Sequence, residues 1–360
     1  MQSTTIKPEC ISEIRTQEMA WEEALQVARA KKEEVNAFFD AARPSELIFA
    51  GCTSPYHAGL VAADFWKAQT GLGARAVTSS ELIMFPELYY PKSGGSPVLI
   101  ALSRSGKTTE TIWAAQEFER RYPGRMILIG CSNPDGPLAQ MAALKLFLPE
   151  SNEQTIPQTR SLGSMLICTL MMAAFRSGDQ RALECLLEAP EKSSVILSQA
   201  EPIVQKLFEK RSYQNIFILG SGYLGGIARE IGLKCMEMST SDAFSYPFLE
   251  TRHGPRSLID ENSLVIGLYS HAGRRYEADL MSELTERHGA TTLAVTPQAD
   301  WETGQVSAAV RVNCDWPDGL IGLAYLPVGQ LAAYYCAISK GQNPDFARFH
   351  AMYVEIKRFE

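Results

Sequence analysis

Short apolar runs alternate along the chain with longer stretches whose apolar residues recur at the spacing of a helix. The short runs have the length of buried strands, whereas the longer stretches are apolar on one side only. Strands are predicted at residues 46–50, 74–78, 98–102, 126–131, 144–148, 215–219, 264–268, 291–295 and 308–312. Helices are predicted at residues 12–40, 60–67, 112–118, 161–176, 195–211, 228–238, 274–288 and 319–340. This alternation predicts an α/β fold in which parallel sheets carry helices on both faces.

The order of elements in the first half of the chain is repeated in the second half. Between the halves, residues 177–194 are charged and contain a proline, so we expect this stretch to be a connector. We therefore predict two doubly wound, flavodoxin-like domains in tandem. The first domain, residues 1–180, includes the N-terminal helix, and the second, residues 181–360, includes the C-terminal tail.

Residues 97–119, PVLIALSRSGKTTETIWAAQEFE, combine a predicted strand, a turn of small hydroxyl-bearing residues and a helix. The first N–H groups of a helix lack partners and the helix dipole is positive there, so such a junction binds anions. The hydroxyls of Ser103, Ser105 and Thr108 add donors, and Gly106 allows a close approach of the backbone to a ligand. We interpret this stretch as a phosphate loop, the alternative being a helix N-cap without a ligand. The second half has YSHAGRRYE at the corresponding place, so we expect one phosphate loop per chain.

Composition narrows the class of protein further. The 360 residues are 46% hydrophobic and 21% charged, as in an ordinary globular protein, and the net charge of −7 argues against a nucleic-acid partner. The N-terminus lacks the apolar core of a signal peptide, and the apolar stretches 165–175 and 319–338 are too short or interrupted to cross a membrane. The eight cysteines show no zinc-ligand spacing, which predicts reduced core thiols and no metal site. We therefore expect a cytoplasmic protein without a membrane partner.

Several motifs carry a resemblance to a known family. SRSGKTTET resembles the phosphate loop of the SIS (sugar isomerase) fold. The order of elements over residues 47–348 resembles the tandem-SIS half of glucosamine-6-phosphate synthase and its stand-alone relatives, which include deaminase/isomerases and deglycases. In GLKCMEMSTSDAFSYPFLETRHGPRSLID, a glutamate precedes by sixteen residues a histidine in a His-Gly-Pro turn, as in the family; these are Glu237 and His253. Glu153, six residues before a Thr-Arg pair, matches a further glutamate of the family.

The chain departs from the family pattern in its first turn and in its C-terminal tail. The usual Gly-Thr-Ser-Tyr is replaced by CTSPY, in which Thr53 and Ser54 are the candidates for contacts with sugar hydroxyls. The tail lysine with which the synthase can form a Schiff base corresponds to Met352, so we do not expect the synthase mechanism to carry over whole. Because no glutaminase domain precedes the first half, we do not expect a glutamine-fed synthase.

Interconversion of an aldose and a ketose needs a base that moves a proton between adjacent carbons and an acid that opens the ring. On the family spacing, our hypothesis assigns Glu237 as the proton carrier and His253 as the acid, with no cofactor and no metal. Without that spacing, the glutamate would be interpreted as a solvated helix residue and the histidine as a turn residue. Substrate and phosphate binding are assigned to Ser103, Arg104, Ser105, Thr108, Thr53, Ser54 and Glu153.

Three functions remain open at this point. The first is a phosphosugar isomerase acting on an amino-sugar or ketose 6-phosphate, with or without loss of the amine. The second is a deglycase of sugar–amino acid 6-phosphates, and the third is a phosphosugar-binding regulator, which would need neither Glu237 nor His253. The resemblance also implies a homodimer, because the family's histidine loop reaches the site of a neighbouring subunit.

Overall fold

Each half of the chain forms one five-stranded sheet in the computed structural model, which describes residues 8–91, 94–209, 211–346 and 351–357. The first sheet contains β1 (Glu46–Gly51), β2 (Gly73–Thr78), β3 (Val98–Ser103), β4 (Met126–Gly130) and β5 (Leu144–Phe147). The second contains β6 (Asn215–Leu219), β7 (Asp242–Tyr246), β8 (Ser263–Leu268), β9 (Thr291–Thr296) and β10 (Ala308–Arg311). The N-terminal residues 1–7 and Arg348, where the family resemblance ends, lie outside the described residues.

The two sheets share one topology. Their strand pairs are parallel, in the order β2-β1-β3-β4-β5 in the first sheet and β7-β6-β8-β9-β10 in the second. The strand order therefore reverses between β1 and β3 in one sheet and between β6 and β8 in the other. In a doubly wound sheet, ligands bind beyond the carboxyl ends of the strands at this switch point. The predicted fold class, two doubly wound domains in tandem, is confirmed.

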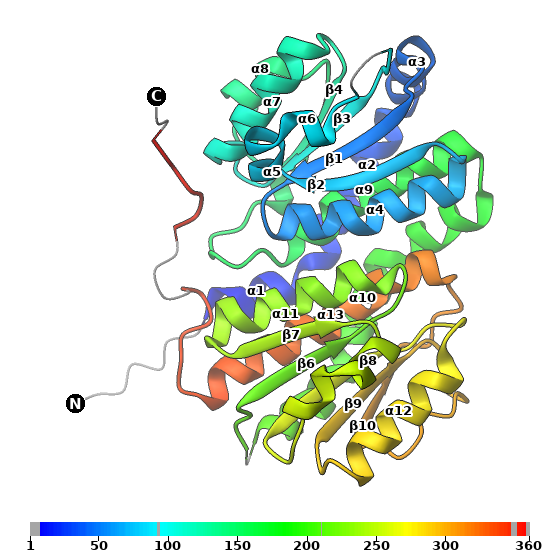
Figure 1. Cartoon of the computed structure of the whole chain (residues 1–360), viewed down its shortest axis with the longest axis vertical. Helices are drawn as coiled ribbons and strands as arrows, with labels where there is room; N and C mark the ends of the chain where they lie inside the picture. Colours follow the sequence, from blue (N-terminus) through cyan, green and yellow to red (C-terminus); the bar gives the residue numbers. More distant parts are fainter. Residues whose placement is uncertain (1–7, 92–93, 210, 347–350, 358–360) are drawn as a thin grey trace.

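Helices cover both faces of each sheet. In the first half they are α1 (Glu9–Arg15), α2 (Gln17–Ala30), α3 (Lys32–Ala42), α4 (Ser54–Thr70), α5 (Ser79–Met84), α6 (Pro86–Tyr89), α7 (Thr109–Arg121), α8 (Pro137–Met141), η1 (Pro149–Ser151) and α9 (Arg160–Ser177). In the second half they are α10 (Gln180–Phe208), α11 (Leu224–Ser239), η2 (Leu249–His253), η3 (Pro255–Leu258), α12 (Arg274–Glu286) and α13 (Asp318–Ser339). Figure 1 shows the two sheets near opposite ends of the molecule, with α4, α9, α10, α11 and α13 between them.

One hydrophobic core fills the space between the sheets. It joins Phe49 and Ile100 of the first sheet to Ile218 and Ile266 of the second through the helices that lie between them. Smaller cores lie on the outer faces, under α7 and under α12. The helix α13 is long and apolar enough to cross a membrane, but 83% of its most apolar window is buried inside the protein, as in a core helix. Since burial of apolar surface is the main stabilising term in folding, the central core holds the two halves together.

Two predicted helices differ from the structure in their bounds, and one strand was not predicted. The expected helix at residues 12–40 is divided into α1, α2 and α3. The helix expected at residues 195–211 starts earlier, because α10 already begins at Gln180, inside the expected connector. The Asp179 carboxylate caps α10 by accepting the Ala182 N–H at 2.9 Å. The strand β7 escaped prediction because it lies at a sheet edge and its side chains are mostly half-exposed, so it lacks a continuous apolar run.

Candidate functional site

The predicted phosphate loop connects β3 to α7 at the switch point of the first sheet. The Ser103 Oγ accepts the Gly106 N–H at 3.0 Å, and the Ser105 Oγ accepts the Lys107 N–H at 3.2 Å. Gly106 has a φ of 63°, and an added Cβ would lie 3.3 Å from the Ser132 carbonyl oxygen. Both the left-handed backbone and the close contact favour glycine at this position. The loop is therefore a tight turn, held by hydrogen bonds to its own serine hydroxyls, that leads into α7.

A cavity of about 250 Å³ lies at this loop and is built from both domains and from the C-terminal tail. Of the predicted site residues, it is lined by Thr53, Ser103, Arg104, Ser105, Thr108 and Glu237. Gln158 and residues 351–354 are among the other lining residues, and of these the sequence analysis had considered only Met352. The structure thus brings the phosphate loop and the predicted proton carrier into one cavity, although they are more than a hundred residues apart.

Glu237 reaches this cavity because α11 of the second domain packs against α4 of the first. The two helices approach closely at Gly226. A Cβ there would lie 2.6 Å from Val61 Cγ2 and 3.0 Å from the His57 carbonyl oxygen, distances too short for any larger residue. The close helix contact therefore sets where the carboxylate stands relative to the phosphate loop.

A buried charge cluster on α11 supports the Glu237 carboxylate. The Lys234 ammonium, 1% exposed, forms an ion pair with Glu237, lies 3.4 Å from Oε1 of Glu230 and donates to the Ser54 Oγ at 3.1 Å. The His57 Nδ1 lies 2.9 Å from the second oxygen of Glu230. Burial alone would lower the pKa of Lys234, but the two carboxylates more than offset this effect and raise that pKa, so the lysine stays charged. Sequence reasoning missed Lys234 and Glu230, although their spacing with Glu237 on one helix face was visible.

Three predicted site residues lie outside the cavity lining. Ser54 is buried, and its hydroxyl accepts a hydrogen bond from the Lys234 ammonium. Glu153 is buried behind the loop, where it accepts hydrogen bonds from the Thr159 N–H and hydroxyl, and its Oε2 lies 3.4 Å from a guanidinium nitrogen of Arg104. His253 ends the short helix η2 and is exposed on the surface. These positions make Glu153 a support for the loop and leave His253 free to meet another molecule.

Thr53 occupies an unusual backbone conformation at the edge of the cavity. Its φ is 54° and its ψ is −114°, and its hydroxyl donates to the Cys52 carbonyl at 2.8 Å. A β-branched residue at positive φ is strained by about 1 to 3 kcal/mol, and such strain is typical of functional sites. The turn therefore holds the Thr53 side chain at the cavity at a cost to stability.

The corresponding switch point of the second sheet is occupied by the chain's own carboxylates. Glu277 accepts the Ser270 N–H and hydroxyl, both at 2.8 Å, while Asp318 accepts the His271 N–H at 2.7 Å and the Ala272 N–H at 3.2 Å. These are the loop amides that would otherwise face an anion. The arrangement is consistent with the expectation of one phosphate loop per chain.

Replacing Glu277 with glutamine is expected to remove a pH-dependent loss of stability. Burial raises the pKa of Glu277 to about 7, despite the opposing hydrogen bonds from Ser270. The protonated form of Glu277 therefore stabilises the fold fully below the ordinary pKa of 4.5, and this stabilisation is lost as the pH rises through about 7. The loss amounts to about 3 kcal/mol in the free energy of unfolding. Chemical denaturation at pH 5 and pH 8 measures this difference. Equal pH slopes for the wild type and E277Q would contradict it, and Glu286→Gln, at an exposed glutamate, is the control.

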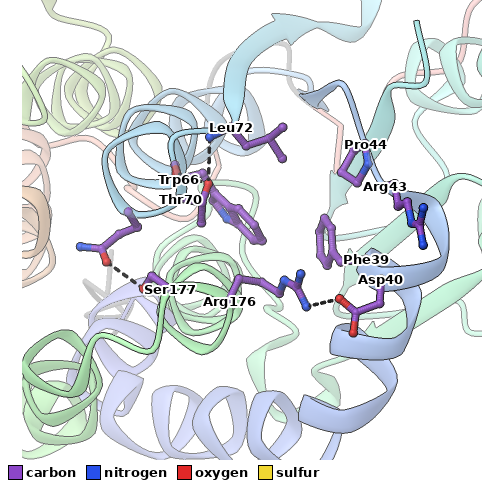
Figure 2. A pocket seen from close by; sticks show the side chains of 10 residues that line it. Phe39, Asp40, Arg43, Pro44, Trp66, Thr70, Leu72, Arg176 and Ser177 are labelled. Carbon is purple, nitrogen blue, oxygen red and sulfur yellow. Dashed lines mark hydrogen bonds and ion pairs between the residues drawn. The ribbon is translucent and has the colours of Figure 1, made fainter.

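A larger cavity, about 670 Å³, opens at the other end of the first sheet (Figure 2). Phe39 and Trp66 are among its lining residues, and Arg176 forms an ion pair with Asp40 at 2.9 Å. It lies near Pro44 and Leu72, just before β1 and β2, and so at the amino ends of the strands. None of the predicted site residues lines it.

Comparison with known proteins decides the family. The chain matches the SIS domain model over residues 42–176 and again over residues 210–339. The chain belongs to the SIS domain family. The SIS matches coincide with the two sheets, and among the described residues no group of three or more His, Cys, Asp or Glu side chains is arranged to hold a metal ion.

The names of curated relatives of this SIS protein describe enzymes that act on sugar phosphates. It is 26% identical over 323 residues to the isomerizing glutamine–fructose-6-phosphate aminotransferase of Aeropyrum pernix, covering 86% of this chain and 51% of that protein. The chain thus spans about half the length of that relative. It is 29% identical over 282 residues to the D-galactosamine-6-phosphate deaminase of Shewanella sp. ANA-3, covering 75% of this chain and 68% of that protein. In fold it is similar to the tagatose-6-phosphate ketose/aldose isomerase structure from Escherichia coli, with a TM-score of 0.85, 24% identity, and coverage of 96% and 99% of the two chains.

Proposed function

We propose that this SIS protein is a phosphosugar isomerase acting on an amino-sugar or ketose 6-phosphate, with release of the amine when the substrate is an amino sugar. The observation that carries the proposal is the presence of the Glu237 carboxylate in the same small cavity as the phosphate loop. Support comes from relatives whose names describe amino-sugar phosphate deamination and sugar-phosphate isomerisation. A regulator that only binds a sugar phosphate would need the loop but not the carboxylate.

The geometry suggests a division of roles within the cavity. The hydroxyls and amides around Ser103, Ser105 and Thr108 bind the phosphate, and this remote binding orients the sugar without taking part in the chemistry. Glu237 takes a proton from one carbon and returns it to its neighbour, as aldose–ketose interconversion requires. Lys234 provides the counter-charge that holds the Glu237 carboxylate in place.

His253 completes the proposed site from a second copy of the chain. It is exposed, lies outside the cavity of its own chain and ends η2, which begins at the exposed Leu249; the next short helix, η3, ends at the exposed Leu258. In a homodimer the histidine would serve as the acid that opens the ring, as the family resemblance implies. Sedimentation of the full chain tests this step, since a monomer at working concentration would leave the site without its acid.

A deglycase of sugar–amino acid 6-phosphates is the second candidate. The tail places Met352 and Val354 in the cavity wall, where the synthases carry a lysine, so Schiff-base formation by a tail lysine has no support here. The same Glu237 could move a proton next to a carbon that bears an amino acid instead of a simple amine. In both reactions the proton transfer gives an imine that water hydrolyses. The two activities differ in the group that leaves and in the carbon that bears the nitrogen, which is C2 of an amino sugar and C1 of a fructose–amino acid.

The product released distinguishes these functions. The full chain would be incubated with glucosamine 6-phosphate, galactosamine 6-phosphate and fructose–amino acid 6-phosphates, with the unphosphorylated sugars as controls. Free ammonia and a ketose 6-phosphate are the expected products of the proposed isomerase and deaminase. A free amino acid would establish the deglycase. Tight binding of a sugar phosphate without any product would overturn both and favour the regulator.

A further inference from the structure

Arg104 belongs to the predicted phosphate loop and lines its cavity, but the hydrogen bonds of its guanidinium go to residues outside the loop. The side chain is buried, 4% exposed, and Nη1 donates to the carbonyl oxygens of Thr155 and Ile156 at 3.0 Å each and lies 3.4 Å from Oε2 of Glu153. The other terminal nitrogen, Nη2, donates to the Met352 carbonyl at 3.2 Å. One guanidinium thus joins the wall behind the loop to the C-terminal tail in front of it.

The backbone of Arg104 is fixed as firmly as its side chain. Its carbonyl oxygen accepts the N–H groups of Cys131 and Ser132 at 3.3 and 3.0 Å, and also the Ser132 hydroxyl at 3.1 Å. Its neighbours are the two serines whose hydroxyls accept loop amides. Arg104 therefore lies between the two loop serines, with its main chain anchored to the residues that follow β4.

The described tail contacts converge on the same loop. The Val354 carbonyl accepts the Thr109 N–H at 3.1 Å, and the Ile356 N–H donates to the Thr109 Oγ1 at 3.3 Å. The Lys107 ammonium lies 5.5 Å from the centre of the Tyr353 ring. Together with the bond from Arg104, these contacts seat the tail on residues 104–109 at the cavity mouth.

We propose that Arg104 is a positioning residue that couples occupancy of the phosphate loop to fastening of the C-terminal tail over the cavity. The ion pair with Glu153 is buried, and breaking it would leave an uncompensated charge, so that part of the contact stays fixed. The bond to Met352, a residue 38% exposed, is the one that can open and close. An anion that orders the serine loop orders Arg104 and strengthens this bond. A direct role of the guanidinium on the phosphate would instead make R104Q lose affinity for phosphate.

Hydrogen exchange of the full chain, read by mass spectrometry, tests the coupling with inorganic phosphate as the first probe. In the wild type, saturating phosphate slows exchange of the tail amides within residues 351–357 about tenfold, the size expected for one charge-assisted hydrogen bond. Arg104→Gln abolishes this slowing while phosphate still binds. Ile356→Pro, which removes the N–H donated to Thr109 and leaves the Arg104–Glu153 pair intact, also reduces it. Arg120→Gln, at an exposed arginine of α7, leaves it unchanged.

Two results would overturn the coupling. One is that phosphate slows exchange of the tail amides in R104Q as much as it does in the wild type. The other is a loss of phosphate affinity in R104Q with the tail response intact, which would make Arg104 a direct ligand. Should R104Q fold poorly, the double variant R104Q/E153Q removes the unpaired buried carboxylate and answers the same question.

The kinetic consequence rests on the proposed function and is measured separately. With glucosamine 6-phosphate, R104Q and I356P lower kcat, whereas KM changes little because the phosphate ligands remain. Absence of turnover in the wild type would reject the proposed function, but the exchange experiment with phosphate would still decide the role of Arg104.

Discussion

Glu237→Gln is expected to lower kcat for sugar-phosphate isomerisation by about a thousandfold, within the range typical of a lost general base. Glutamine has the same shape, and its amide can still face Lys234, but it cannot accept a proton from carbon. The affinity for the sugar phosphate should change little, because the phosphate loop lies on a different element. Steady-state kinetics and a binding isotherm for the same preparation separate the two effects.

The control for this variant is Glu286→Gln, which makes the same chemical change at an exposed position of α12. It should retain full turnover. Full turnover in E237Q as well would show that Glu237 is not the proton carrier. Loss of both binding and turnover would mean that the substitution had disturbed the cavity, and the thermal stability of the variant would reveal this.

Lys234→Met is expected to reduce the free energy of unfolding by about 3 to 5 kcal/mol, the usual result of removing one partner of a buried ion pair. Lys234 is 1% exposed, and its loss leaves the carboxylates of Glu230 and Glu237 close together without a counter-charge. The pKa of Lys234 is raised, so the charged lysine contributes this stability below its ordinary pKa and loses it only as the pH rises through the raised value. Urea denaturation at neutral pH measures the effect.

The double variant E230Q/K234M separates lost charge balance from lost packing. Removing one of the two carboxylates should recover part of the stability, because less buried charge then remains unpaired. Lys206→Met, near the end of α10, controls for the change of a lysine to an apolar side chain. Stability of K234M within about 0.5 kcal/mol of the wild type, the usual range for surface changes, would contradict the buried cluster.

The elements that sequence predicts well are those whose pattern is local. β3 is fully buried, so its apolar run is continuous, and the strand was placed within one residue. β7 fails by the same criterion, because an edge strand buries few of its side chains. The start of α10 was missed because charged residues and Pro190 hide a helical stripe of small apolar residues that packs on α13.

The same distinction between local sequence patterns and tertiary contacts applies to the residues of the site. The proposed phosphate loop is contiguous in sequence, so its residue types and spacing were enough to predict it. Glu237 could be assigned only by resemblance, because the packing that brings it to the loop joins helices from different halves. The spacing of Lys234 from Glu237 could have indicated a charge cluster. Its burial, however, depends on tertiary packing that the sequence pattern does not show. The position of the tail in the cavity wall is likewise set by contacts that no local pattern records.

The close contact of α4 and α11 at Gly226 has a consequence for which sugars the proposed site can accept. The helix spacing fixes the separation between the proposed phosphate loop and the Glu237 carboxylate. These two groups would contact opposite ends of one substrate molecule. The contact would therefore determine which length of carbon chain can reach both groups at once. A substrate with a shorter chain could satisfy either end but not both, so discrimination by length would follow from the packing of α4 against α11 at a point remote from the sugar.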